Sequence, residues 1–389
     1  EMELCGFSAD VNGLKALSSE LDTRIKSLES EIYSLVGYEF NLNSPKQLGV
    51  ALFEKLGLPA KKKTKSGYST GAEVLEGLKN EHPAVSLLLN YRQLAKLKST
   101  YADGLQECIA EDGRIHSTFN QTEARTGRIS SLEPNLQNIP VRTAEGRRLR
   151  EYFNAPAGRV LCDADYSQIE LRVLASMSGD ANMINAFGSG TDIHTVTASQ
   201  VFGLPQDMIT PELRSRAKAV NFGIVYGIGA FSLSKDIGVT RAEADRYIKS
   251  YLAAYPGVAA YMEKAIEDAK KNGYVTTLYG RRRYIPELSN SNGNMRAFGE
   301  RVARNAPIQG TAADIIKIAM IKVSRSLKEE FPTARLILQV HDELIVECDE
   351  RDAEGVCALL EREMESAADL AVRLTAEAHF GKTWLEAKA

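Results

Sequence analysis

Hydrophobic residues recur at steps of three and four between positions 14 and 35, which predicts one long amphipathic helix. Its apolar members are Leu14, Leu17, Leu21, Ile25, Leu28, Ile32 and Leu35. Farther along, Ser44 and Thr70 are each followed three residues later by Gln or Glu, the pattern of a helix start. We therefore expect residues 1–110 to form a helical arm with a loop at 61–71. Ordinary coiled-coil packing explains the repeat without any special function.

The hydrophobic pattern changes after residue 111. Residues 115–122 alternate between apolar and polar side chains, as a strand does. Residues 123–143 carry few apolar groups and many Ser, Asn, Gln and Arg. So long a polar stretch inside a compact protein is typically a functional loop or a disordered one. Its cationic and amide side chains suit contact with phosphates and base edges.

The remainder of the chain mixes strand and helix patterns. We expect a strand at 159–166, helices at 168–177 and through 180–272, a short strand at 274–278, a helix near 295–331, a β-hairpin at 335–348 and a closing helix at 352–370. The strands gather around two acidic positions, and helices are inserted between them. This arrangement predicts an α+β core with helical appendages.

Two aspartates mark the ends of these apolar strands. Asp165 and Asp342 lie 177 residues apart (342 − 165 = 177). Strand alternation places Asp163 on the same face as Asp165. Mg²⁺ prefers oxygen ligands and needs few protein carboxylates, so two aspartates suffice for two ions that a triphosphate bridges. Taken singly, each acid is readily explained as a turn residue or as half of an ion pair.

A four-residue periodicity marks the predicted helix at 211–227. It places Arg214, Lys218, Phe222 and Tyr226 on one slanted stripe. Two cations suit the phosphates of a nucleotide, and two rings suit its sugar and base. An amphipathic surface helix that ends at glycine shows the same spacing. His194 can add a phosphate donor, although a lone histidine is more often structural.

A second helical stripe carries amide and guanidinium groups. Arg301, Asn305 and Gln309 recur every four residues. Such side chains can donate to the minor-groove acceptors that every base pair presents. A helix surface with an interior proline kink explains the stripe equally well.

Composition and charge limit the class of protein. The chain has 389 residues, 44% hydrophobic and 25% charged, which predicts a globular protein of two or three subdomains. Its net charge of −3 argues against general nucleic-acid binding, although basic clusters at 61–65, 147–150 and 281–283 allow a local basic track or an ordinary solvated surface. Five scattered cysteines without a CxxC pair indicate a reducing, cytoplasmic setting. No apolar run approaches the ~20 residues of a membrane span. Because the chain begins without Met, we expect it to be one part of a longer polypeptide.

The ordered motifs resemble those of family A DNA polymerases. DYSQIELR at 165–172 resembles motif A, the helical stripe from Arg214 to Gly227 resembles motif B, and QVHDE at 339–343 resembles motif C. Further similar blocks are TGRISS at 126–131, PNLQNIPVR at 134–142 and NAPIQGTAADIIK at 305–317. No Walker loop, HExxH, GxSxG or kinase HRD motif is present.

This resemblance implies a right-hand architecture with an antiparallel-sheet palm. The thumb would comprise 1–115, with the start of the palm at its extreme N-terminus. The palm would comprise 116–178 and 296–389, and helical fingers would occupy 179–295. Neither a 5′-nuclease nor a 3′→5′ exonuclease domain lies in these residues, so the resemblance implies a polymerase fragment and supports no claim of proofreading.

The resemblance also implies an activity and its cofactors. A DNA-directed DNA polymerase, a nucleotidyltransferase of replication and repair, adds dNTPs to a primer 3′-OH and releases pyrophosphate. Two Mg²⁺ ions, which Mn²⁺ can replace, would be bound by Asp165, Asp342 and the Tyr166 carbonyl, with Glu343 nearby as a further catalytic group. Arg214, Lys218 and His194 would hold the triphosphate, and Lys218 would donate a proton to pyrophosphate.

The remaining expected roles concern the substrate sugar, the bases and the DNA. Phe222 would pack on the incoming nucleotide, Tyr226 would guard the templating position, and Glu170 would exclude a 2′-OH. Arg128, Asn305 and Gln309 would monitor the minor groove at the primer end. The expected contacts with primer, template or substrate are Gln168, Arg301, Asn135, Gln137, Asn138 and, at the primer terminus, His341.

The expected partners are primer-template DNA and dNTPs, for a monomer in the bacterial cytoplasm, associated with the nucleoid and not with a membrane. Two other functions remain open at this point. A single-subunit RNA polymerase shares the palm, but Glu170 argues against it. A non-catalytic module that binds duplex DNA is the other alternative, and the paired acids and the cationic–aromatic stripe argue against it.

Overall fold

A four-stranded antiparallel sheet lies at the base of the molecule, with strand order β10-β11-β7-β12. The computed structural model describes residues 1–389 except 61–62, 65–66, 142 and 389. The four strands are β7 (Arg159–Tyr166), β10 (Arg335–Val340), β11 (Glu343–Asp349) and β12 (Ala376–Gly381). The pairing of β7 with β11 sets Asp165 directly opposite Glu343. The sheet therefore joins the two acidic segments that are far apart in the sequence.

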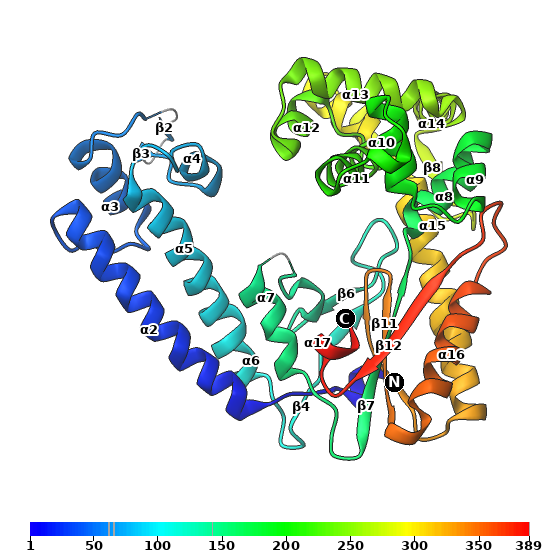
Figure 1. Ribbon diagram of the computed structural model, residues 1–389, viewed down its shortest axis with the longest axis horizontal. Helices are drawn as coiled ribbons and strands as arrows, with labels where there is room; N and C mark the ends of the chain where they lie inside the picture. Colours follow the sequence, from blue (N-terminus) through cyan, green and yellow to red (C-terminus); the bar gives the residue numbers. More distant parts are fainter. Residues whose placement is uncertain (61–62, 65–66, 142, 389) are drawn as a thin grey trace.

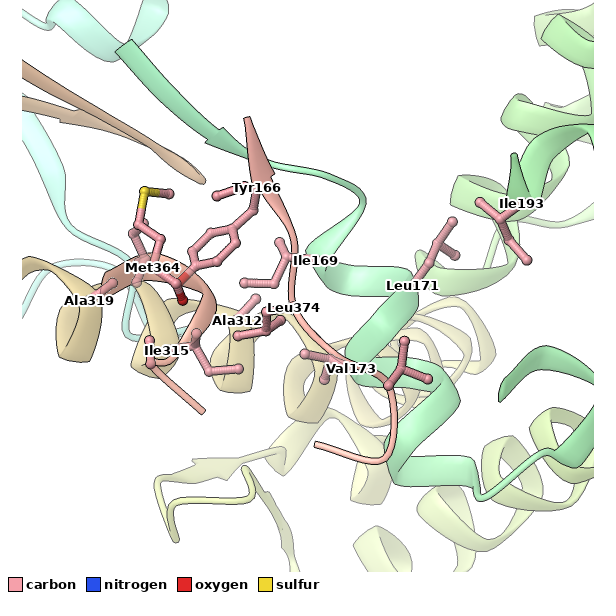
Figure 2. Packing of buried hydrophobic residues seen from close by; sticks show 14 of the residues in the cluster. Tyr166, Ile169, Leu171, Val173, Ile193, Ala312, Ile315, Ala319, Met364 and Leu374 are labelled. Carbon is pink, nitrogen blue, oxygen red and sulfur yellow. The ribbon is translucent and has the colours of Figure 1, made fainter. Parts of the chain in front are cut away.

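One face of this sheet packs against two helices, α15 (Gly293–Glu330) and α16 (Ala353–Glu365). The side chains of β7 in this core are Val160, Cys162, Ala164 and Tyr166. Figure 2 shows the Tyr166 ring pointing toward Met364 and α15. The Tyr166 hydroxyl donates a 2.6 Å hydrogen bond to the Met364 carbonyl. The end of β7 is therefore anchored where Asp165 projects to the opposite face.

The opposite face of the sheet is covered in part by a short helix, α17 (Trp384–Ala387). Its Trp384 side chain is fully buried and contacts Phe7 and Phe153, with ring centroids 5.7 and 5.6 Å away. Leu161 and Ile345 belong to the same core. Helix α17 and strand β12 were not predicted, and the closing helix ends at Glu365 instead of continuing to residue 370.

A long helical arm rises from the sheet (Figure 1). Helix α2 (Val11–Val36) packs along α5 (Pro83–Leu97), and π-helical turns occupy Val50–Lys55 and Lys98–Asp103. The predicted amphipathic stripe is confirmed from Leu14 to Ile32, whose members are buried. Its last member is wrong: Leu35 is 40% exposed, and Val36 is buried in its place.

The two predicted helix starts in this arm differ in outcome. Ser44 caps α3 (Pro45–Gly49) by accepting from the Gln47 amide, as expected. The Thr70 prediction is wrong, because α4 (Ala72–Glu76) begins after Gly71 without a side-chain cap. Thr70 is instead buried, and its carbonyl accepts from the Arg92 guanidinium. In the expected loop, β2 (Lys63–Thr64) pairs with β3 (Gly67–Tyr68), whereas 61–62 and 65–66 lie outside the described residues.

The polar segment after residue 111 contains more structure than a loop. It contains the strands β4 (Arg114–Ile115), β5 (Thr118–Asn120) and β6 (Ser130–Leu132), followed by a 3₁₀ turn at Leu136–Asn138, α7 (Ala144–Arg148) and a 3₁₀ turn at Leu149–Tyr152. Three short elements precede this segment, namely α1 (Met2–Cys5), β1 (Phe7–Ser8) and α6 (Gly104–Glu107). The strand predicted at 115–122 is thus split between β4 and β5. The buried Ser131 hydroxyl accepts from the Leu136 amide and pairs with the Ser117 hydroxyl. Polar side chains therefore satisfy each other locally and order this segment.

A group of helices stands across from the arm (Figure 1). They are α8 (Ile169–Ser178), α9 (Ala181–Gly188), α10 (Ile193–Phe202), α11 (Pro211–Val225), α12 (Ala230–Ile237), α13 (Arg241–Ala254) and α14 (Pro256–Asn272), followed by the hairpin β8 (Tyr274–Thr276) and β9 (Arg282–Tyr284), with 3₁₀ turns at Gln206–Met208, Pro286–Ser289 and Glu350–Asp352. The predicted α+β class is confirmed. None of the helices in the described parts of the chain is long and apolar enough to cross a membrane.

Candidate active site

Asp165 and Asp342 meet at one end of the sheet. The Tyr166 amide donates to the Asp342 carbonyl across 3.2 Å, so the residues that follow β7 and the tip of the β10–β11 hairpin lie side by side. Gln168 and His341, which flank the two acids, have left-handed φ angles of 52° and 54°. Left-handed backbone at non-glycine residues is uncommon and gathers at functional sites. The predicted convergence of the two aspartates is confirmed by this geometry.

The electrostatics of the pair favour a bound cation. Withdrawal from water raises the pKa of Asp342 to about 7, and the charge of Asp165 adds to this effect. The same desolvation raises the pKa of Asp165, against the opposing charge of Lys388. The Asp165 side chain is 43% exposed, yet its Oδ1 is shut off from solvent and has no partner among the described residues. An unpartnered oxygen beside a second desolvated carboxyl is a suitable ligand set for a hard divalent ion.

The number of ligands agrees with magnesium rather than with a closed protein cage. The described residues contain no group of three or more His, Cys, Asp or Glu side chains arranged to hold a metal ion. Mg²⁺ is commonly bound by one or two carboxylates while water and substrate phosphates complete its shell. Asp165 and Asp342, together with a backbone carbonyl such as that of Tyr166, therefore fit Mg²⁺.

A second group of residues supports the acids from α17. Trp384 Nε1 donates to Glu343 Oε1 at 2.8 Å and to Asp163 Oδ2 at 3.2 Å. Lys388 Nζ donates to Glu343 Oε2 at 2.7 Å and to Asp165 Oδ2 at 2.9 Å. Both oxygens of Glu343 are thus occupied by α17 and the residue after it. Sequence reasoning missed Trp384 and Lys388; the one available signal was that Trp384 is the only tryptophan of the chain.

The two buried carboxyls of this second group, Asp163 and Glu343, together carry one negative charge. Burial raises the pKa of Asp163 to about 10, and the neighbouring Glu343 adds to the effect. Burial also acts to raise the pKa of Glu343, but Lys388 and the hydrogen bonds outweigh it and hold that pKa below its usual value. Glu343 is therefore the ionised member and Asp163 the protonated one. Glu343 supports the site indirectly, because it binds the same ammonium, of Lys388, that contacts Asp165.

The predicted stripe lies on α11 and continues just beyond its end at Val225. The Phe222 and Tyr226 rings stack with centroids 6.4 Å apart. A Cβ at Gly223 would lie 2.5 Å from Ile228, and Gly227 has a φ of 65°, so both glycines are required by packing and by the turn. A cavity of about 800 Å³, lined in part by Phe222, Tyr226 and Arg301, opens beside the stripe.

The expected phosphate ligands are only partly free. Arg214 donates from Nε and Nη2 to the two oxygens of Asp192, each at 2.9 Å. Burial opposes the ionisation of Asp192, but hydrogen bonds from Arg214 and Thr195 lower its pKa to about 2. His194 is buried, its Nδ1 lies 3.0 Å from Asn221 Nδ2, and burial lowers its pKa to about 4. Lys218 is exposed, one turn beyond Arg214.

The residues expected at the minor groove form one cluster. Arg128 Nη2 donates to Glu170 Oε1 at 2.6 Å. With its amide oxygen turned toward Arg128, Gln309 accepts from both Nη atoms at 3.2 Å. Half-burial of Tyr226, with the charge of Glu170, raises the pKa of this phenol to about 12. Asn305, one turn before Gln309, keeps a buried Oδ1 without a partner among the described residues.

Three other expected DNA contacts hold the polar segment in place. Asn135 caps the turn at Leu136–Asn138 by accepting from the Gln137 amide at 3.0 Å. Gln137 Nε2 donates to the Gln339 carbonyl on β10 at 3.0 Å, and the Asn138 carbonyl accepts from the Tyr101 hydroxyl. Contacts of these side chains with DNA stay predictions.

The basic clusters are partly used inside the protein. Arg148 donates to both oxygens of Glu20, Arg150 is buried with its guanidinium 4.5 Å from the centroid of Trp384, and Arg281 pairs with Asp314 at 2.6 Å. These arginines contribute less free charge than the sequence indicates. Of the cluster at 61–65, positions 61, 62 and 65 lie outside the described residues.

Comparisons with known proteins agree with this geometry. The family model described as DNA polymerase family A matches residues 11–386. DNA polymerase I of Geobacillus stearothermophilus is 50% identical over 389 residues, which is 100% of this chain and 44% of that protein. DNA polymerase I of Bacillus subtilis (strain 168) is 52% identical over 391 residues, again 100% of this chain and 44% of that protein. The chain thus spans less than half the length of these relatives.

A solved structure extends the comparison to three dimensions. The POL domain of Pol1 from M. smegmatis, solved in complex with DNA primer-template and dNTP, matches with a TM-score of 0.94 at 45% identity. The match covers 100% of this chain and 69% of that one. It confirms the predicted polymerase fold. The chain belongs to DNA polymerase family A.

Proposed function

We propose that this chain is the polymerase domain of a template-directed DNA polymerase, which adds dNTPs to a primer 3′-OH and releases pyrophosphate. The observation that carries the proposal is the meeting of Asp165 and Asp342 at one end of the sheet, with an unpartnered oxygen of Asp165 beside the desolvated carboxyl of Asp342. The M. smegmatis domain, bound to primer-template and dNTP, supports the same activity. We propose 1–115 as thumb, 116–178 and 296–389 as palm, and 179–295 as fingers.

Asp165, Asp342 and the Tyr166 carbonyl would hold two Mg²⁺ ions. When bound, such ions lower the pKa of the primer hydroxyl and neutralise charge on the leaving pyrophosphate. Because the pKa of Asp342 is about 7, this carboxyl is protonated in a fraction of the molecules at neutral pH. In those molecules it must release the proton when a cation binds. The anchored Tyr166 ring keeps the carbonyl and Asp165 in place, so the protein contributes position more than covalent chemistry.

Arg214 and Lys218 would bind the triphosphate, with Lys218 as the proton donor to pyrophosphate. Arg214 is held by Asp192, so a triphosphate must compete with that carboxylate for the guanidinium. A hydrogen bond from Asn221 to Nδ1 of the neutral His194 leaves its proton on Nε2, which can then donate to a phosphate oxygen once the ring becomes accessible.

The nucleoside would lie beside Phe222 and Tyr226, where the cavity opens. Glu170 is only 7% exposed and is held by Arg128, so its carboxylate has little freedom to make room for a 2′-OH. This rigidity supports Glu170 as the group that excludes ribonucleotides, and it argues against an RNA polymerase. Arg128, Gln309 and Asn305 would then face the minor groove of the primer end.

A primer-extension assay tests the proposal directly. The wild type should extend a primer in the presence of Mg²⁺ and dNTPs, whereas Asp342→Asn should lose at least about 10³-fold in rate. Duplex binding by the variant should persist, because Asp342 is proposed to bind metal and not DNA. Asp369→Asn, at an exposed position away from the sheet edge, is the matched control and should remain active. Extension by Asp342→Asn at the wild-type rate would overturn the proposal.

A bacterial, nucleoid-associated location in the cytoplasm is part of the same proposal, supported by the bacterial sources of the relatives.

A further inference from the structure

A lysine outside the recognised motifs reaches into the site. Lys388 directly follows α17, and its Nζ lies 2.9 Å from Asp165 Oδ2, 2.7 Å from Glu343 Oε2 and 3.8 Å from Asp163 Oδ1. Burial acts to lower the pKa of Lys388, but the neighbouring acids, with Glu343 first among them, outweigh it and raise that pKa. The ammonium is therefore a cation that already neutralises part of the acidic site.

The position of Lys388 is built into the core. Trp384, one turn earlier, is fully buried against Phe7 and Phe153, and the Arg150 guanidinium lies 4.5 Å from the centroid of its ring. The Trp384 amide donates to the Phe153 carbonyl at 2.8 Å. Helix α17 is thereby fixed against the sheet. The side chain of Lys388 is 34% exposed, but this anchored segment fixes its backbone so that the ammonium reaches Asp165 and Glu343.

The contacts of Lys388 divide the acids into two kinds. Glu343 has both oxygens occupied, by Trp384 and by Lys388. Asp165 offers Oδ2 to Lys388 and keeps Oδ1 without a partner. Lys388 therefore links a carboxylate that supports the site to a carboxylate that would bind metal, and it leaves one oxygen of the latter available.

We propose that Lys388 is a positioning residue that sets the divalent-metal affinity of the site formed by Asp165 and Asp342. Its ammonium orients Asp165 while its positive charge weakens the binding of an ion that arrives without substrate. The four negative charges of a triphosphate would offset this repulsion, so that full occupancy follows nucleotide binding. The inference rests on the proposed two-metal function.

The test measures Mn²⁺ binding to the protein alone, without DNA or dNTP, from the electron paramagnetic resonance signal of free Mn²⁺. Lys388→Met removes the charge and keeps a similar side-chain length, and it should bind Mn²⁺ about three- to tenfold more tightly than the wild type. Lys388→Arg keeps the charge and should stay within about twofold. Lys382→Met is the matched control, because Lys382 pairs with Glu350 at 2.6 Å and not with the active-site acids.

Asp165→Asn separates failure of this inference from failure of the proposed function. If Asp165→Asn removes Mn²⁺ binding but Lys388→Met binds as the wild type does or more weakly, the role of Lys388 is overturned. If Asp165→Asn leaves Mn²⁺ binding intact, the proposed metal site itself is wrong. The rise in melting temperature with added Mn²⁺ is the second readout: it should be larger for Lys388→Met than for the wild type, even if the metal-free variant is less stable, and an equal or smaller rise would contradict the inference.

Discussion

Replacing His194 by Gln should remove a pH dependence from the stability of the fold. His194 is 1% exposed on α10, and its Nδ1 lies 3.0 Å from Asn221 Nδ2. The groups packed around it are Asp192, which favours the imidazolium, and Lys218 and Arg214, which disfavour it. Burial dominates and lowers the pKa to about 4. Gln can still accept from Asn221, but it cannot take up a proton.

The size and sign of the effect follow from this pKa. The unfolded chain has a histidine pKa of about 6.5, so a folded value near 4 corresponds to about 2.5 × 1.36, or about 3 kcal/mol at most. Between these two values the unfolded chain binds more protons than the folded one, so stability rises with pH. The contribution is fully present above about pH 6.5 and is lost as the pH falls toward about 4.

Urea unfolding of wild type and His194→Gln between about pH 4 and pH 8 measures this difference. As the pH falls through the lower part of this range, the free energy of unfolding of the wild type should decrease by up to about 3 kcal/mol more than that of the variant. His379→Gln, at an exposed position of β12, controls for the loss of a histidine and should follow the wild type. Parallel curves for wild type and His194→Gln would refute the assignment of a buried neutral imidazole.

Three further variants test other parts of the site. Glu170→Ala should lower discrimination against ribonucleotides by about 10- to 200-fold in a competition assay, and unchanged discrimination would remove Glu170 as the sugar filter. Asp192→Asn keeps an acceptor for the start of α10 but weakens its hold on Arg214, so the KM for dNTP should fall about two- to fivefold, whereas a rise would contradict competition between carboxylate and phosphate. Trp384→Phe leaves Glu343 without its indole donor and should cost about 2–3 kcal/mol in urea unfolding, and a cost below about 0.5 kcal/mol would show that the bond is dispensable.

The strands and helices with strong local patterns were predictable. Strand β7 combines apolar alternation with a polar break, and α2 carries an apolar stripe over about six turns, so burial of one face decides both. The meeting of Asp165 and Asp342 was predictable because each ends such a strand. The cluster of Arg128, Glu170 and Gln309 came instead from the resemblance to family A, since nothing local connects these three positions.

The missed features depend on contacts between distant segments. Strand β12 contains Ala378 and Gly381, which have low strand propensity, and pairing with β7 holds it in the sheet. Lys388 reaches Asp165 only because Trp384 packs against Phe7, more than 370 positions earlier (384 − 7 = 377). Thr70 has the sequence of a helix cap, but Arg92 captures its carbonyl. Local patterns contain no information on these partners.

The most direct test of the central claim is a crystal structure of the protein with primer-template DNA, dNTP and Mn²⁺, measured for the anomalous scattering of manganese. We expect two anomalous peaks between the carboxylates of Asp165 and Asp342, each within about 2.5 Å of a carboxylate oxygen. Lys388 should remain on Glu343 in that structure. The absence of manganese from both aspartates, with nucleotide bound in the site, would contradict the account.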